Sequence, residues 1–485
     1  MLFNTWAFPV FLLIVFAGHF LGSRCFANRA LAQVLLLVGS SIFFYGYENP
    51  QLIFLLLASV CLNGLATRFL LSPRSSSSAR RVVCVVALLG NFAGIAFFKY
   101  AGLIVSLIFP NGSVSWVNSI PLPLGISFYT FEGISLIVDA YYGRKMGFDT
   151  LREDIKNGTN LLFFGRVALF MTFFPHLVAG PIVRGHDFLG QIRGKTLADI
   201  DWYYAIRKLI LGFFLKMVVA DNLKEATAGL IYPNFLSLSK PELILLLYGY
   251  SFQIFADFCG YSLIAMGLAA LFGYRFPLNF NLPYLSRSMT EFWRRWHISL
   301  STWLRDYLYF PLGGNRNGAL RVYFNLFIVM FLGGLWHGAA WSYAIWGSAH
   351  GAFLAVERFF RNRSEIEKPS SLPISILQAF IVFNIVSFLW LLFKLPHFQD
   401  VCSYFQALAH AQWKPHPQTG FVIILFSIPV VLFHLWGAVF GHSSDQAESP
   451  SWPFKGLCEN ILLGVMLFLV VVNSGPAGTF IYFQF

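Results

Sequence analysis

The chain has little charge and no paired cysteines. Only 12% of its 485 residues are charged, whereas 57% are hydrophobic. A soluble domain carries about 25% charged residues, so this chain has too few polar side chains to cover a surface in water. Its six cysteines are scattered and form no Cys-x-x-Cys pair, which gives no support for a disulfide framework or a metal site. The composition excludes a single soluble domain, a disordered chain, collagen and a coiled coil.

Apolar runs that span a bilayer, or nearly do so, occur along the whole chain. The requirement is about 20 consecutive, mostly apolar residues. The runs lie at about 6–22, 31–47, 51–71, 82–108, 122–142, 161–180, 205–220, 241–272, 322–356, 374–395, 420–440 and 460–473. The sequence therefore predicts an all-α, polytopic transmembrane bundle, built as one membrane-embedded domain over residues 1–485.

Lysines and arginines outnumber acidic residues by 34 to 22. In a membrane protein this excess indicates loops held on the cytoplasmic side and not binding to nucleic acid. Basic loops alternate with loops that lack Lys and Arg up to about residue 142, which places the N-terminus outside. The run 161–180 breaks the alternation and contains Arg166, Pro175 and His176. We expect it to be a re-entrant or half-depth element.

The run 322–356 is expected to enter the membrane and return on the same side. It lies between the most basic loop, 273–321, and a second basic cluster that begins at Arg358. We therefore predict a re-entrant hairpin with its apex at the glycine-rich segment 333–338. This places His337 at membrane depth, where an ionisable side chain is a candidate functional residue. The alternative is a hydrogen-bonded structural histidine.

A helical wheel of Glu291–Phe310 gathers polar side chains on one side and apolar or aromatic side chains on the other. The pattern predicts one amphipathic helix that lies along the cytoplasmic surface of the membrane. His297 falls on the apolar side, near its edge. Two interpretations stay open for it, a site residue or a histidine packed at the membrane interface.

Several ionisable residues fall inside apolar runs. They are Glu132, Asp139, Lys99, Lys216 and Asp257, together with the histidines His176 and His350. A buried acid needs a partner such as an arginine, a histidine or a water-filled funnel. Ion pairs or funnel-lining positions are expected for the charged residues, and structural positions for His176 and His350. The chain also lacks a Gly-x-Ser-x-Gly elbow, a P-loop and a His-x-x-x-x-Asp pattern, so serine-hydrolase and ATP-driven chemistry have no support.

Two segments resemble signature motifs of the membrane-bound O-acyltransferase family. The segment 284–316 contains YLSRSMTEFWRRWHISLSTWLRDYLY followed by PLGGNR, and the segment 333–338 reads GGLWHG. PLGISFYTF at 123–131 and FPHLVAGPIVR at 174–184 resemble further motifs of its bacterial polysaccharide branch. That branch includes alginate O-acetylases and peptidoglycan O-acetyltransferases, with the D-alanyl transferase for teichoic acids as a more distant member. The motif at 257–263, DFCGYSL, departs from the branch pattern of a serine and a second aspartate.

The resemblance implies a fold and a set of site residues. The family fold is a ring of spans around a re-entrant core, with funnels from both faces that meet near the motif histidine, here His337. His337 is then the candidate catalytic base, and His297 would orient the donor or support the site. Arg294, Arg295 and Arg305 would hold the phosphates of the donor, and Asp257 and Trp336 would line a funnel. The resemblance implies no bound cofactor and no metal.

The end of the chain, residues 480–485, reads FIYFQF. Such a tail resembles the end of alginate-type enzymes and of a small partner subunit in the D-alanylation system, where a tyrosine is suspected of carrying the acyl group. Tyr482 is therefore a candidate acyl relay. The alternative is an aromatic anchor at the membrane interface.

The leading functional hypothesis is an O-acetyltransferase of a bacterial inner membrane. Acetyl would pass from cytoplasmic acetyl-CoA to a cell-envelope polysaccharide, alginate-like or peptidoglycan, through an extracytoplasmic acetyltransferase or relay protein. The expected partners are acetyl-CoA, that protein, the polysaccharide and membrane lipids. Alternatives are acylation of a lipid or a protein, D-alanyl transfer to teichoic acid, and a transporter or channel. The predicted surface helix and hairpin, and the lack of an inverted repeat, argue against transport.

Overall fold

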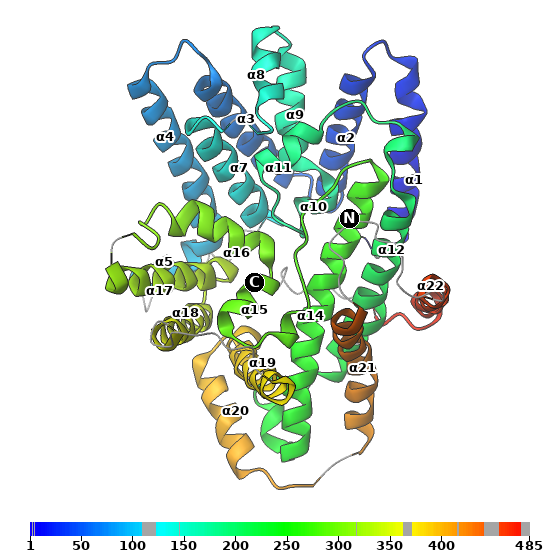
Figure 1. Cartoon of the computed structure of the whole chain (residues 1–485), viewed down its shortest axis with the longest axis vertical. Helices are drawn as coiled ribbons and strands as arrows, with labels where there is room; N and C mark the ends of the chain where they lie inside the picture. The colour runs from blue at the N-terminus through cyan, green and yellow to red at the C-terminus, as the bar shows by residue number, and fades with distance from the viewer. Residues whose placement is uncertain are drawn as a thin grey trace. The chain divides into compact units, whose positions relative to one another are not determined.

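The structure is a computed structural model that describes residues 1, 3, 5–108, 123–144, 146–316, 318–361, 371–414, 417–440 and 455–476. Within these ranges all regular structure is helical and no strand is present (Figure 1). The prediction of an all-α chain is confirmed there. The chain divides into two compact units. Unit 1 comprises residues 1–209 and 262–277, and unit 2 comprises residues 210–261 and 278–485.

Eight helices in the described ranges are long and apolar enough to cross a membrane. They are Ala7–Cys25, Arg29–Gly46, Leu52–Leu71, Ser77–Val105, Lys240–Leu271, Gly318–His337, Leu372–Lys394 and Gly420–Val439. The runs at 161–180 and 460–473 form the shorter apolar helices Asn160–Thr172 and Gly456–Val472. The chain is therefore a multi-pass membrane protein, with fewer full-length spans in these ranges than the twelve apolar runs suggested.

Unit 1 is built from the N-terminal helices and the loops that connect them. In Figure 1, α3 and α4 lie beside α7, and α2 packs against α9. Side chains cap three of these helices, because Asn28 accepts from Leu31 N–H, Ser76 from Ala79 N–H and Asp201 from Tyr204 N–H. The helices are α1 Ala7–Phe20, α2 Arg29–Gly46, α3 Leu52–Leu71, α4 Ser77–Ile95, α5 Ala101–Ile108, α7 Ile126–Tyr141, α8 Asp149–Lys156, α9 Asn160–Thr172, α10 Phe174–Leu177, α11 Gly185–Phe188 and most of α12 Trp202–Phe213.

The run 161–180 forms a broken helix. α9 ends at Thr172, and the one-turn helix α10 follows after Phe173. Arg166, which the hydropathy pattern left unexplained, forms an ion pair with Asp154 at 2.7 Å. The expectation that this run does not form a single full-length spanning helix agrees with the structure.

Unit 2 begins within α12 and contains both histidine motifs. Its helices are η5 Phe214–Ala220, α13 Asp221–Ala226, most of α14 Lys240–Leu271, η7 Pro283–Leu285, α15 Met289–Arg295, α16 Ile298–Leu304, η8 Arg305–Tyr309, α17 Gly318–His337, α18 Trp341–Arg361, α19 Leu372–Lys394, α20 Phe398–His410, α21 Pro417–Phe440 and α22 Lys455–Val472. Both η5 and η8 are π-helical, a form that occurs mostly as single turns within α-helices, often at functional sites.

α17 and α18 form a helical hairpin over the run 322–356, whose return to the same side of the membrane stays a prediction, and its turn lies later than the centre of the predicted apex. α17 continues to His337, and the turn to α18 lies at residues 338–340. Gly333 and Gly334 therefore lie inside a helix, and Gly334 packs directly against Gly347 of α18. The segment is glycine-rich because two helix backbones approach closely there. The chain turns only after His337, at residues 338–340.

The predicted single amphipathic helix over Glu291–Phe310 is wrong. α15 ends at Arg295 and α16 begins at Ile298, with His297 between them in the left-handed region at φ 43°. Backbone groups at the break bond to another segment, because Ile298 N–H donates to Asn279 C=O and Asn281 N–H donates to Arg295 C=O, both at 2.9 Å. A wheel drawn on one axis does not describe these two short helices.

Candidate active site

His337 lies at the C-terminal end of α17 among aromatic side chains. The side chain is 4% exposed. Its ring centroid lies 5.2 Å from Trp346 of α18 and 5.1 Å from Phe393 of α19, with both rings edge-on. Gly338 follows directly, and a side chain at that position would run into the Tyr343 ring. The hairpin thus holds the imidazole in water-poor surroundings.

His297 is buried inside unit 2. It is 1% exposed and occupies the N-cap position of α16. The edge of its ring meets Phe258 of α14 at a centroid distance of 4.6 Å, and its Nδ1 lies 3.1 Å from Asn279 Oδ1. His297 lies outside the eight candidate spans, and burial lowers its pKa to about 3. The ring is therefore neutral at physiological pH.

Trp336 joins the two histidine motifs. The centroid of its ring lies 4.8 Å from that of His337 and 6.2 Å from that of His297. Trp336 is itself buried. Three of the residues that the sequence singled out, from segments 40 positions apart, thus form one cluster.

The aromatic wall around this cluster was not predicted. Trp346 contacts both His337 and His350, and Trp390 stacks on Trp346 at 5.6 Å. Trp293 Nε1 donates a hydrogen bond to His350 Nδ1 at 3.3 Å. The buried His350 therefore contributes to packing, in line with its expected structural position. Trp346 and His350 are four residues apart on α18, a spacing that would have placed them on one helix face.

Asp257 has a partner in Lys216. Lys216 Nζ lies 2.8 Å from Asp257 Oδ1 and 2.7 Å from Asp221 Oδ1, and all three residues are buried. The cluster joins the π-helical η5 and α13 to α14. The chain after α22 docks beside it, since Gly475 N–H donates to Met217 C=O at 2.8 Å. Asp257 is thus part of a buried ion cluster one residue from Phe258, which touches His297.

The three arginines proposed as phosphate ligands differ in their partners. Arg295 pairs with Glu291 at 2.7 Å, and Arg305 pairs with Asp306 at 2.8 Å. Arg294 on α15 is exposed, and no described acidic side chain forms an ion pair with it. Within the described part of the chain, Arg294 is therefore the one of the three without an acidic partner to exchange. Tyr482 lies outside the described residues.

The two buried acids of unit 1 that the sequence singled out, Glu132 and Asp139, also have partners. Glu132 lies 2.8 Å from His176 Nδ1, and Asp139 lies 3.1 Å from Arg144 and 2.8 Å from His186. These contacts agree with the expectation of ion pairs. Among the described residues, no three His, Cys, Asp or Glu side chains are grouped so that they could hold a metal ion.

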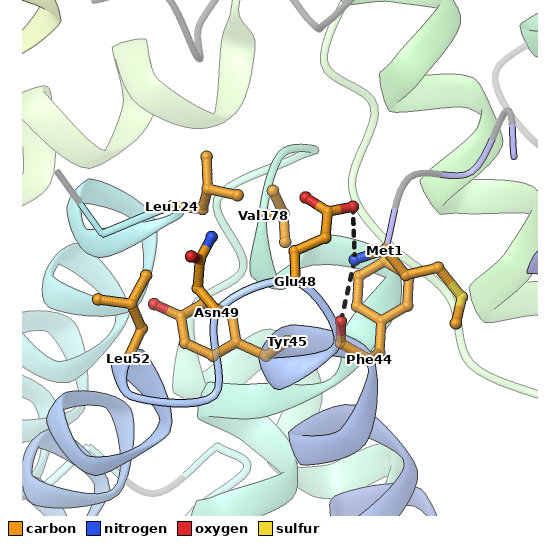
Figure 2. A pocket seen from close by; sticks show the side chains of 8 residues that line it. All are labelled: Met1, Phe44, Tyr45, Glu48, Asn49, Leu52, Leu124 and Val178. Carbon is orange, nitrogen blue, oxygen red and sulfur yellow. Dashed lines mark hydrogen bonds and ion pairs between the residues drawn. The ribbon is translucent and has the colours of Figure 1, made fainter. Parts of the chain in front are cut away.

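A separate pocket of unit 1 contains none of the predicted site residues (Figure 2). There the Met1 amine contacts Glu48 at 3.4 Å and donates to Phe44 C=O at 3.2 Å. The other lining residues are Tyr45, Asn49, Leu52, Leu124 and Val178.

Comparison with known proteins bears on the same motifs. The model of the membrane-bound O-acyltransferase family matches residues 122–396, which is more than half of the chain and includes both histidines of the cluster. The peptidoglycan O-acetyltransferase of Helicobacter pylori is 33% identical over 424 residues, or 82% of this chain and 78% of the relative. The probable alginate O-acetylase AlgI of Pseudomonas aeruginosa is 35% identical over 404 residues, or 82% of this chain and 73% of the relative.

A third relative shares less of the chain. The teichoic acid D-alanyltransferase of Bacillus subtilis is 32% identical over 295 residues, which cover 56% of this chain and 68% of the relative. The family resemblance and the acyltransferase class predicted from the motifs are thereby confirmed. With its helical, multi-pass structure and this match, the chain belongs to the membrane-bound O-acyltransferase family.

Proposed function

We propose that the protein is an inner-membrane O-acetyltransferase that passes acetyl from cytoplasmic acetyl-CoA to a cell-envelope polysaccharide. The observation that carries the proposal is the cluster of His337, Trp336 and His297, in which two buried imidazoles contact one tryptophan of an acyltransferase. Relatives named for peptidoglycan and for alginate match at similar identity, which supports a polysaccharide acceptor and leaves both polysaccharides as candidates.

The proposed chemistry requires one base. His337 removes the proton from the attacking hydroxyl as its oxygen forms a bond to the thioester carbonyl carbon. The C–S bond breaks, and the proton passes to the departing CoA sulfur, so that an ester and a free thiol result. A positioned base contributes about 10²–10⁴-fold to such a step. The aromatic walls of Trp346 and Phe393 keep water away from the thioester, which suppresses hydrolysis.

The other predicted residues act on the donor in this proposal. His297 supports the site through its contact with Trp336, and Arg294 holds a phosphate of CoA by a charge-assisted hydrogen bond. Arg295 and Arg305 would have to give up Glu291 and Asp306 to do the same.

Delivery outside the membrane is the last part of the proposal. The acceptor hydroxyl belongs to an extracytoplasmic partner or to the polysaccharide itself, with Tyr482 as a candidate relay. A phenol ester on Tyr482 is still activated, so transfer onward to a sugar hydroxyl remains downhill. D-alanyl transfer is less favoured because the D-alanyltransferase relative covers 56% of this chain, against 82% for the O-acetyltransferases.

A label-transfer experiment tests this function. Purified protein in proteoliposomes is given acetyl-CoA labelled in the acetyl group, and both free thiol and labelled polysaccharide are measured. In cells, mass spectrometry counts acetyl groups on peptidoglycan and exopolysaccharide with and without the gene. The proposal predicts thiol release and loss of acetyl from one polysaccharide when the gene is deleted. Unchanged acetylation of both polysaccharides, or transfer from a D-alanyl donor alone, contradicts it.

A further inference from the structure

Asn279 is a fully buried amide whose side chain faces the helix break at His297. Its Oδ1 lies 3.1 Å from His297 Nδ1, 2.9 Å from Ser299 Oγ and 3.3 Å from Ser299 N. Its backbone C=O accepts from Ile298 N–H at 2.9 Å. One residue, 18 positions before the histidine, thus contacts three consecutive residues of the break.

These contacts determine which nitrogen of His297 carries the proton. A backbone N–H can only donate, so the Asn279 atom that faces Ser299 N–H is the oxygen and not the NH₂ group. That oxygen only accepts, so the contact with His297 requires a proton on Nδ1. A neutral imidazole has one ring proton. The lone pair, and with it the basicity, therefore lies on Nε2.

The same residue holds an uncommon backbone conformation. His297 has φ 43° and ψ 54°, in the left-handed region that residues with a side chain rarely adopt. The hydrogen bond from Ile298 to Asn279 fixes the chain directly after it. The Phe280 ring packs on the Trp296 ring at a centroid distance of 5.0 Å, so the segment around Asn279 also contacts the residue before His297. Strained residues held in this way cluster at functional sites.

We propose that Asn279 is a positioning residue, which holds His297 as the Nδ1–H tautomer so that Nε2 is the basic nitrogen at the site shared with His337. The proposal rests on the proposed function, in which His297 supports acyl transfer. An amide does this without adding charge, so the buried histidine stays neutral and able to accept a proton. A carboxylate in the same place would favour the imidazolium.

The ionisable groups near His297 come from several elements. Burial is the sole cause of its lowered pKa, so none of them contributes a resolved charge effect. α14 carries Asp257 and Cys259, and Lys216 of η5 pairs with Asp257. Arg295 lies on α15 and His337 on α17. A new charge at position 279 would therefore be the main charge effect on the pKa of His297.

Two substitutions of Asn279 separate positioning from simple packing. Asn279→Asp keeps an oxygen on Nδ1–H but adds a negative charge, which raises the pKa of His297. His297 supports the site in its neutral form, so the acid limb of the kcat/KM profile for acetyl-CoA moves to higher pH by about 1–3 pH units. Asn279→Leu removes the acceptor, and kcat falls about 10- to 100-fold with little change in KM.

Asn325→Asp is the matched control, because Asn325 is an equally buried asparagine of the same unit that contacts Leu312 and Gly314. It also buries a carboxyl group, but not beside a histidine, and should leave the acid limb where it is. An Asn279→Asp profile identical to wild type, or an unchanged kcat in Asn279→Leu, overturns the proposal. If Asn279→Leu does not accumulate, the Asn279→Asp profile still decides.

A direct measurement keeps this result independent of the proposed function. ¹⁵N NMR of histidine-labelled full-length protein, compared with the His297→Asn variant, identifies the signal of His297. The proposal predicts a protonated Nδ1, which shifts toward the imidazolium signal in Asn279→Asp. A protonated Nε2 overturns it, even if acetyl transfer is normal. Absence of acetyl transfer together with a protonated Nδ1 counts against the proposed function and supports the tautomer assignment.

Discussion

Substituting alanine for Gly334 should force apart the two helices that hold His337. Gly334 lies inside α17, one turn before His337, and faces Gly347 of α18. A Cβ at Gly334 would lie 2.9 Å from Gly347 Cα and 3.0 Å from Gly347 N, and would also meet the Tyr343 carbonyl oxygen. All three are backbone atoms, so no side-chain rotation relieves the clash.

The size of the effect follows from these distances. Carbon atoms in contact lie about 3.5–4.0 Å apart, so α17 and α18 must separate by about 0.6–1 Å. The His337 ring, which packs on Trp346 of α18, is then displaced relative to the aromatic side chains around it. A misplacement of about 1 Å can lower a rate by about 10²-fold, and overpacking destabilises by about 1–3 kcal/mol. We expect folded Gly334→Ala protein to transfer acetyl about 10- to 100-fold more slowly.

The assay is the rate of acetyl transfer per mole of monodisperse, detergent-purified protein, with Gly333→Ala beside it. The nearest atom to a Cβ at Gly333 is Leu304 Cδ1 at 3.2 Å, the end of a flexible side chain. Gly333→Ala should therefore keep nearly the wild-type rate. Equal rates for the two variants would refute the reasoning that backbone contact at Gly334 sets the position of His337.

Three further substitutions test other parts of the account. Lys216→Met should destabilise the protein by about 3–5 kcal/mol, because Asp221 and Asp257 lose their buried cation. Size-exclusion recovery after heating measures this loss, and adding Asp221→Asn and Asp257→Asn should restore recovery, whereas an unaffected single variant contradicts the ion cluster. His297→Ala should lower turnover and weaken acetyl-CoA binding, and unchanged values remove His297 from the site. Tyr482→Phe should stop acetylation without loss of protein if Tyr482 is a relay, and wild-type acetylation rejects the relay.

The sequence predicted the features that depend on composition and on local patterns. The apolar runs indicated an all-α membrane protein because bilayer thickness sets the length of a spanning helix. The charges inside those runs indicated partners, since an unpaired buried charge is costly. Lys216 and Asp257 were both noted in this way. Their pairing was not predicted, because 41 residues separate them and no periodicity relates η5 to α14.

The parts that failed depend on contacts between distant segments. The wheel over Glu291–Phe310 assumed one helix axis, and Asn279 interrupts that axis with hydrogen bonds from a segment 18 residues away. The glycines before His337 were interpreted as a turn, although a glycine in a helix also permits close packing. Only the fold shows which of these two uses applies, because Gly347 lies on the other arm of the hairpin.

The central claim is that His337 is the base for acyl transfer, and the acetyl-transfer rate of purified His337→Gln protein tests it most directly. His350→Gln is the matched control, because both histidines are buried on the two arms of one hairpin and both contact Trp346, at 5.2 Å and 4.6 Å. The account predicts a loss of about 10²–10⁴-fold in folded His337→Gln, with transfer retained in His350→Gln. Wild-type transfer by His337→Gln would contradict it.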